Sequence, residues 1–142
     1  MSQYYALGGQ TLWNPSNGAS RLFLRQVALF EAELGLPSGI GPMESDECRI
    51  APVAFKAFAD ALLARHRRTT HAVMIALSEG FVSTVLVLAR RADIELAWNA
   101  TGSAAGDQLT DLQVPAPPAP DQETWAADLR QRSLELGRFM AR

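Results

Sequence analysis

The segment HAVMIALSEGFVSTVLVLA, from His71 to Ala89, restricts the fold more than any other part of the chain. Its length approaches the roughly 20 apolar residues that cross a bilayer, and a pair of arginines lies on each side. Glu79 and Gly80, however, occupy its centre, and a carboxylate at the bilayer midplane is costly. We therefore predict a central, buried helix that is apolar on nearly all sides. The β-branched run FVSTVLVL, residues 81–88, leaves a strand as the alternative for the second half.

Two further helices are predicted ahead of this segment, because apolar residues recur there at helical spacing. The first ends before Gly35 and Pro37, which are typical of a helix C-terminus. The second is predicted to begin at Pro52. The N–H groups in the first turn of a helix have no intrahelical partner, so the N–H that proline lacks is not needed there. The predicted apolar faces consist of Phe23, Val27, Phe30 and Leu34 in the first helix, and of Phe55, Phe58, Leu62 and His66 in the second.

Short β elements are predicted at two places. The Gly8-Gly9 pair can supply the positive φ of a tight turn between strands at Tyr4–Leu7 and Gln10–Trp13. The sequence ADIELAW predicts a short strand near 94–98. The fold class is therefore mainly α: a single-domain helical bundle with a small β element.

The C-terminal part of the chain is predicted to be a tethered helix. Residues 1–98 form the expected helical core, and the proline-rich stretch 99–120 is typical of a flexible linker. Within 121–142, an amphipathic helix must dock on its own bundle or on a neighbouring subunit. Its predicted apolar face consists of Trp125, Leu129, Leu136 and Met140.

The composition narrows the classes of function. A formal net charge of −2 argues against non-specific nucleic-acid binding, which needs a positive surface. The single cysteine excludes an internal disulfide, and the first residues lack the features of a signal peptide, so a cytoplasmic location is expected. The chain has no P-loop, dinucleotide-binding, zinc-protease or nucleophile-elbow motif, and we expect no cofactor.

An acidic loop is the first candidate site. The stretch GPMESDECRIAP brings Glu44, Asp46 and Glu47 next to Cys48, the only cysteine. In an extended segment Glu44 and Asp46 would lie on one side, roughly 7 Å apart at Cα, where they could share a divalent ion or act as an acid/base pair. The alternative is that these acids complement the dipole of the following helix. Cys48 is expected to be a small buried hydrophobe, because neighbouring acids raise the pKa of a thiol.

Glu79 and the two histidines are the second set of candidates. A carboxylate within an apolar helix must find a partner or take up a proton, so Glu79 is a candidate general acid or base. His66 and His71 would point about 140° apart on one continuous helix, which excludes a zinc pair on one helical face. The candidate catalytic residues are therefore Glu79, Glu44, Asp46 and His71.

Candidate ligand-binding residues are Trp13, Asn14, Glu47 and His66. In the sequence LWNPS, Asn14 or Ser16 can cap the first long helix, and Trp13 can close the core or line a ligand pocket. No metal-ligand set with a known spacing is present in the sequence, so no resident metal is assigned.

The stretches LWNPS, LGLPSGIGPMESDEC and LSEGFV together resemble a small, uncharacterised actinobacterial protein family. The resemblance extends to about Trp98 and leaves the proline-rich tail outside. No established activity comes with that family. The resemblance implies a bacterial, intracellular, single-domain protein.

Two classes of function follow from these residues. The first is a non-catalytic module that binds a protein or small molecule through the acidic loop and the Trp13 region, with a homodimer through the C-terminal helix as a further expectation. The second is a cofactor-free acid/base enzyme, such as an isomerase, cyclase or hydrolase. A pocket into which an acid and a histidine converge would favour the enzyme, whereas dispersed carboxylates with a salt-bridged Glu79 would favour the binding module.

Overall fold

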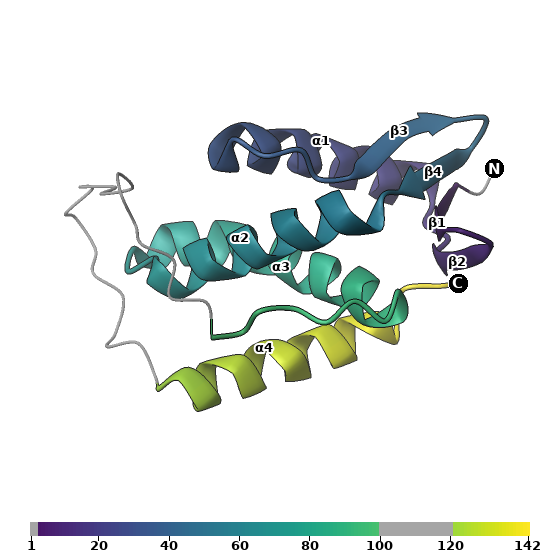
Figure 1. Ribbon diagram of the computed structural model, residues 1–142. Coiled ribbons are helices and arrows are strands. Elements are labelled where there is room, and N and C mark those ends of the chain that lie inside the picture. Colours follow the sequence, from purple (N-terminus) through teal and green to yellow (C-terminus); the bar gives the residue numbers. More distant parts are fainter. Residues whose placement is uncertain (1–2, 100–120) are drawn as a thin grey trace.

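The computed structural model describes residues 3–99 and 121–142, which form a mainly helical structure with a small sheet at one end (Figure 1). The predicted linker 99–120 lies outside these residues apart from Asn99. The strands are β1 (Tyr4–Leu7), β2 (Gln10–Trp13), β3 (Ile40–Glu44) and β4 (Glu47–Ile50). The helices are α1 (Asn17–Leu34), α2 (Pro52–Arg68), α3 (Ala72–Arg91) and α4 (Gln122–Gly137).

The long apolar segment is a helix throughout, as predicted, and its second half lies in the core. Every residue of α3 from Phe81 to Ala89 is buried except Thr84. The ring of Phe81 stacks on that of Phe30 of α1, with centroids 4.5 Å apart. The first half is less enclosed, and Leu77 is 70% exposed. By length and composition α3 would suffice to cross a membrane, a criterion that core helices of soluble proteins also meet.

The first of the two helices that precede α3 ends as predicted, and the second begins as predicted. Ser16 rather than Asn14 caps α1, because its hydroxyl oxygen accepts a hydrogen bond from the Ala19 N–H. Gly35 ends α1 in the left-handed conformation, at φ 65°. Pro52 is the first residue of α2, and the predicted apolar faces of both helices turn inward. Arg65 is also buried, and its guanidinium pairs with Glu33 of α1 at 2.7 Å.

The sheet is larger than the sequence predicts. The expected β1–β2 hairpin is present, but a second hairpin, β3–β4, joins it in the order β2-β1-β4-β3. The central pair, β1 and β4, is parallel. The turn of the second hairpin consists of Ser45 and Asp46, which both have positive φ, at 50° and 64°. Such a turn is usually indicated by Asn-Gly. Ser-Asp lacks this signal, so the sequence does not predict the hairpin.

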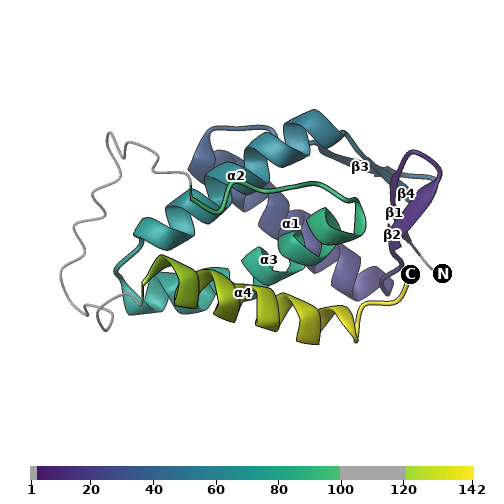
Figure 2. The ribbon, with the colours of Figure 1, turned by 60° about the horizontal axis from the view of Figure 1, so that its bottom comes forward.

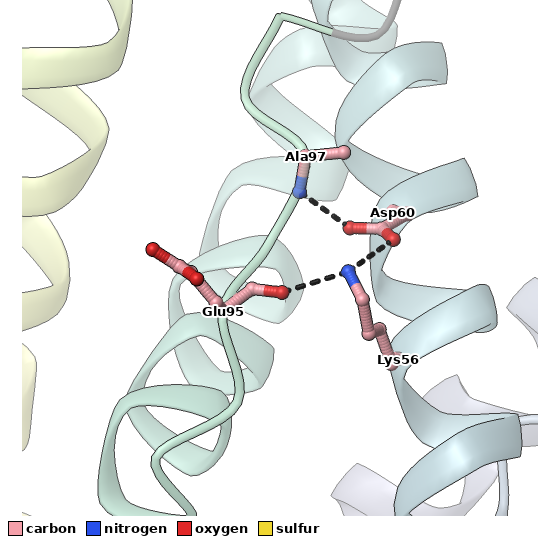
Figure 3. Close-up of polar contacts among 4 residues, drawn as sticks. All are labelled: Lys56, Asp60, Glu95 and Ala97. Atoms are coloured by element: carbon pink, nitrogen blue, oxygen red, sulfur yellow. Dashed lines mark hydrogen bonds and ion pairs between the residues drawn. The ribbon is translucent and has the colours of Figure 1, made fainter.

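The predicted strand near 94–98 is wrong. Residues 94–97 have no regular secondary structure and run back from the end of α3 along α2, opposite α4 (Figure 2). Side chains of α2 take the place of a partner strand. Lys56 Nζ donates to the carbonyl of Glu95 at 2.7 Å, and the Ala97 N–H donates to Asp60 Oδ1 at 2.7 Å (Figure 3). These polar groups are thereby satisfied without a sheet.

The C-terminal helix packs on its own chain. α4 lies beside α3 in both views of the ribbon (Figures 1 and 2), with Ala126, Leu129 and Ser133 buried between them. The predicted apolar face is largely confirmed, since Met140 is buried and Trp125 and Leu136 are partly buried. The apolar face of α4 is thus satisfied within one chain.

Arg91, the last residue of α3, joins three parts of the structure. Its guanidinium donates to the carbonyls of Leu12 at 2.6 Å, Gly137 at 2.9 Å and Met140 at 2.7 Å. These carbonyls belong to β2, to the end of α4 and to the tail that follows it. The Asn14 N–H donates to the carbonyl of Ala141 at 2.9 Å and closes the same junction. The C-terminus is therefore held against the N-terminal hairpin.

Replacing Arg91 by alanine should destabilise the protein by about 2–4 kcal/mol, because three partly buried carbonyls lose their charged hydrogen-bond donor. Chemical denaturation followed by circular dichroism measures this loss. Arg25→Ala, on an exposed face of α1, is the control and should change the free energy of unfolding by less than about 0.5 kcal/mol. Equal effects for both variants would contradict the role assigned to Arg91.

Gly39 and Gly80 should respond to alanine in opposite directions. Gly39 has φ +71°, and an added Cβ would lie 2.5 Å from the Phe55 nitrogen, so Gly39→Ala should cost at least about 2 kcal/mol. Gly80 lies within α3, and nothing is within 4 Å of an added Cβ, so Gly80→Ala should stabilise by about 0.5–1 kcal/mol. Melting temperatures of the two variants test this, and a shift of the same sign in both would contradict it.

Candidate functional site

The acidic loop is the turn of an exposed hairpin. Glu44 lies directly opposite Glu47 across the β3–β4 pair, and Glu47 pairs with Arg49 at 3.4 Å. Asp46 occupies the turn itself, so regular alternation does not place it beside Glu44. Within the described residues, no group of three or more His, Cys, Asp and Glu side chains is arranged to hold a metal ion. The described acids of the hairpin therefore do not form a metal-binding cluster.

Cys48 is buried on the inner side of this hairpin, as expected. Its thiol donates to the carbonyl of Gly41 at 2.8 Å, and burial raises the pKa of the thiol to about 12. The thiol is thus protonated at neutral pH, which removes it as a nucleophile.

The two histidines lie at the opposite end of α2 from the hairpin. Because α2 begins at Pro52, the helical rise puts His66 about 21 Å farther along its axis. His71 caps α3, where its Nδ1 accepts a hydrogen bond from the Met74 N–H at 3.3 Å. His66 is buried near Trp125, with ring centroids 6.4 Å apart. Neither histidine meets the hairpin acids.

Glu79 forms an ion pair. Its carboxylate pairs with the guanidinium of Arg132 on α4, so the charge in the apolar helix also fastens α4 to α3. Glu79 lies eight positions after His71, which corresponds to about 12 Å along the helix axis. The predicted catalytic residues are therefore not brought together in the described structure.

Trp13 and Asn14 belong to the structural core and its edge. Trp13 is 8% exposed, and its ring stacks on Tyr5 and meets Phe23 edge-on, with centroids 5.2 and 5.4 Å away. Asn14 holds the C-terminal tail through its backbone, and its buried Oδ1 has no hydrogen-bond partner within the described structure. Trp13 thus closes the core, which is one of its two predicted roles.

A groove that the sequence analysis missed lies between α3, residues 94–98 and α4. Its volume is about 310 Å³, within the lower range of small-molecule pockets. The floor is the last turns of α3, one wall is the segment after α3, and the other wall is α4. The lining consists of Leu86, Ala89, Arg90, Ile94, Glu95, Leu96, Trp98, Arg130, Ser133 and Leu134. We call this the α3–α4 groove.

The two walls of the α3–α4 groove are held in different ways. The Lys56–Asp60 pair on α2 fixes the backbone of residues 95–97 (Figure 3). At the end of this wall, the ring of Trp98 meets that of Trp125 edge-on at 6.0 Å. Arg130 on α4 also lies over the indole, 4.3 Å from the Trp98 ring centroid. The cation–π contact therefore joins the two walls.

The lining is apolar with a few charged groups. The described residues include no carboxylate within 4 Å of the guanidinium of Arg90 or of Arg130. Glu95 is the one acid among the lining residues that the structure describes, and its side chain points away from the Lys56–Asp60 pair (Figure 3). The Ser133 hydroxyl donates to the Arg130 carbonyl at 2.8 Å. The lining residues within 3–99 and 121–142 thus include no nucleophile–base pair.

The sequence gives little signal for this groove. Each wall residue has an ordinary structural explanation on its own helix or loop, and the walls are separated by more than 30 residues. The clearest hint is the pair of tryptophans that flank the predicted linker, since an indole with room on one face can line a ligand site.

The fold and groove define a mainly helical protein with a small mixed sheet and a candidate binding site under its C-terminal helix. The chain belongs to a family of unknown function, DUF6086, whose model matches residues 1–142. The family therefore includes the C-terminal tail, which the resemblance had left outside. No curated protein and no solved structure matches the chain. The actinobacterial origin stays a prediction.

His66 should make stability depend on pH. Burial, and then the charge of Arg132, lower the pKa of its imidazole. The unfolded chain therefore binds the proton more readily, and stability should fall as pH drops below about 6.5 towards the lowered pKa. Denaturation at about pH 7.5 and about pH 5.5 should give a smaller difference for His66→Gln than for the natural protein. An unchanged difference would assign the pH dependence to other groups.

Proposed function

We propose that this protein is a non-catalytic binding module and that a small molecule with an apolar body occupies the α3–α4 groove. The observation that carries the proposal is the groove itself, an apolar hollow of about 310 Å³ whose walls are fixed by polar contacts. Pockets of this size and lining are the usual sites for small ligands. The proposal moves the ligand site away from the acidic loop and Trp13.

The dispersal of the acids and histidines supports binding over catalysis. An acid/base enzyme needs both groups within reach of one substrate, at hydrogen-bond distance or through one water. The hairpin acids and His66 are separated by most of the length of α2, and Glu79 is neutralised by Arg132. A histidine that is buried with a lowered pKa, and another that caps a helix, have structural roles here.

The volume of the groove favours a small molecule over a protein as its occupant. Stable protein interfaces cover large, nearly flat areas, whereas about 310 Å³ accommodates one compact molecule. The cytoplasmic location and a homodimer stay predictions and are not needed for this proposal.

The test uses a neutral fluorescent probe, N-phenyl-1-naphthylamine, titrated into the protein. Saturable binding is expected, and Leu134→Glu should weaken it at least about tenfold, because a charge on the wall must be desolvated by an apolar ligand. Leu134 is 48% exposed, so the substitution should preserve the fold.

Leu29→Glu is the matched control. Leu29 is an exposed helical leucine of similar exposure, 56%, but it lies on α1 and is not part of the groove lining. Its affinity for the probe should equal that of the natural protein. Absence of saturable binding, or equal weakening by both substitutions, would overturn the proposed function.

A further inference from the structure

Arg130, an exposed residue of α4, presents a positive charge on the lining of the α3–α4 groove. Its guanidinium lies 4.3 Å from the centroid of the Trp98 ring. Trp98 is itself held, because its carbonyl accepts a hydrogen bond from Gln122 and its ring meets Trp125. A guanidinium that rests on an aromatic face still has N–H groups at its edge for a planar anion. Little conformational entropy then remains to be lost when an anion binds.

Several other arginines pair with a carboxylate or donate to backbone carbonyls, whereas the described contact of the Arg130 guanidinium is with the ring of Trp98. Arg132, two residues along α4, pairs with Glu79, and Arg91 donates to three carbonyls. No carboxylate of the described residues lies within 4 Å of the Arg130 guanidinium. Ser133 cannot replace Arg130 as a hydrogen-bond donor to an anion in the groove, because the Ser133 hydroxyl already donates to the Arg130 carbonyl.

Positive charge also gathers at the far end of the groove. Arg90 belongs to the lining, and its Nη2 reaches to 2.8 Å from where a Cβ of Gly137 would lie. Burial lowers the pKa of Arg91, and the charges of Arg142 and Arg90 lower it further. Among the described lining residues Glu95 is the only acid, and against the two arginines it leaves this set with a net positive charge.

We infer that the ligand of the α3–α4 groove is an amphipathic anion, with its apolar body on the floor of α3 and its anionic group on the guanidinium of Arg130. Planar carboxylates match the guanidinium edge best, and sulfonates have the same charge and acceptor oxygens. The inference rests on the proposed function and specifies the class of ligand.

The experiment compares two probes with one apolar skeleton. 8-Anilinonaphthalene-1-sulfonate carries a sulfonate, and N-phenyl-1-naphthylamine is the same molecule without it. The natural protein should bind the sulfonate more tightly. Arg130→Gln should lower the affinity for the sulfonate at least about tenfold and that for the neutral probe less than about twofold, as expected for loss of a charge-assisted hydrogen bond.

Two further variants control for position and sign. Arg132→Gln makes the same change two residues away, at an arginine outside the groove lining, and should leave the ratio of the two affinities unchanged. Glu95→Gln removes the only acid among the described lining residues and should strengthen binding of the sulfonate alone. The natural protein gives an independent measurement. Raising the ionic strength from about 0.05 to about 0.5 M should lower its affinity for the sulfonate and leave its affinity for the neutral probe unchanged.

The outcomes separate this inference from the proposed function. If neither probe binds the natural protein saturably, both fail. If both probes bind equally and salt affects neither selectively, the groove binds apolar molecules and the inference about the anion is overturned. If Arg90→Gln removes the preference for the sulfonate while Arg130→Gln keeps it, the assignment to Arg130 is overturned.

Discussion

The guanidinium of Arg91 is the contact on which the C-terminal half of the structure depends. It lies where α3 ends, and it gathers carbonyls from β2, from the end of α4 and from the tail. Helix C-termini leave carbonyls without intrahelical partners, and the half-buried guanidinium of Arg91 donates to that of Gly137 as well as to the carbonyls of Leu12 and Met140. The position of α4 against α3 follows from this junction together with the Glu79–Arg132 pair. The groove exists only because α4 is held there.

Several parts of the fold could be predicted from the sequence because their signals are local. The apolar stripe of α1, the glycine at its end and the proline that starts α2 each act within one turn of helix. The secondary structure of α3 was harder to predict, because its β-branched residues favour strands. Burial against α1 and α4 decided in favour of a helix, as tertiary packing commonly overrides intrinsic preference.

The missed elements depend on contacts between distant residues. The β3–β4 hairpin turns at Ser45-Asp46, which lacks the glycine that would indicate positive φ, and its pairing with β1 spans about 40 residues. Residues 94–97 were predicted to belong to a strand, yet Lys56 and Asp60 of α2 supply partners for their backbone groups. No pattern in one segment can predict which side chain of another segment satisfies its backbone. The groove was missed for the same reason, because each wall is unremarkable alone.

The placement of one groove wall on α4 links occupancy to the dynamics of the C-terminal helix. Native proteins open locally, and a terminal helix detaches at a lower free energy than the central core. A molecule that needs both walls can bind only while α4 is docked, so by mass action its presence lowers the population of the detached state. Amide hydrogens of α4 would then exchange more slowly, while those of α1 and the buried half of α3 would change little. The linkage is reciprocal. A change that weakens the Arg91 contacts lowers the apparent affinity of the groove for its ligand, even when no lining residue is altered.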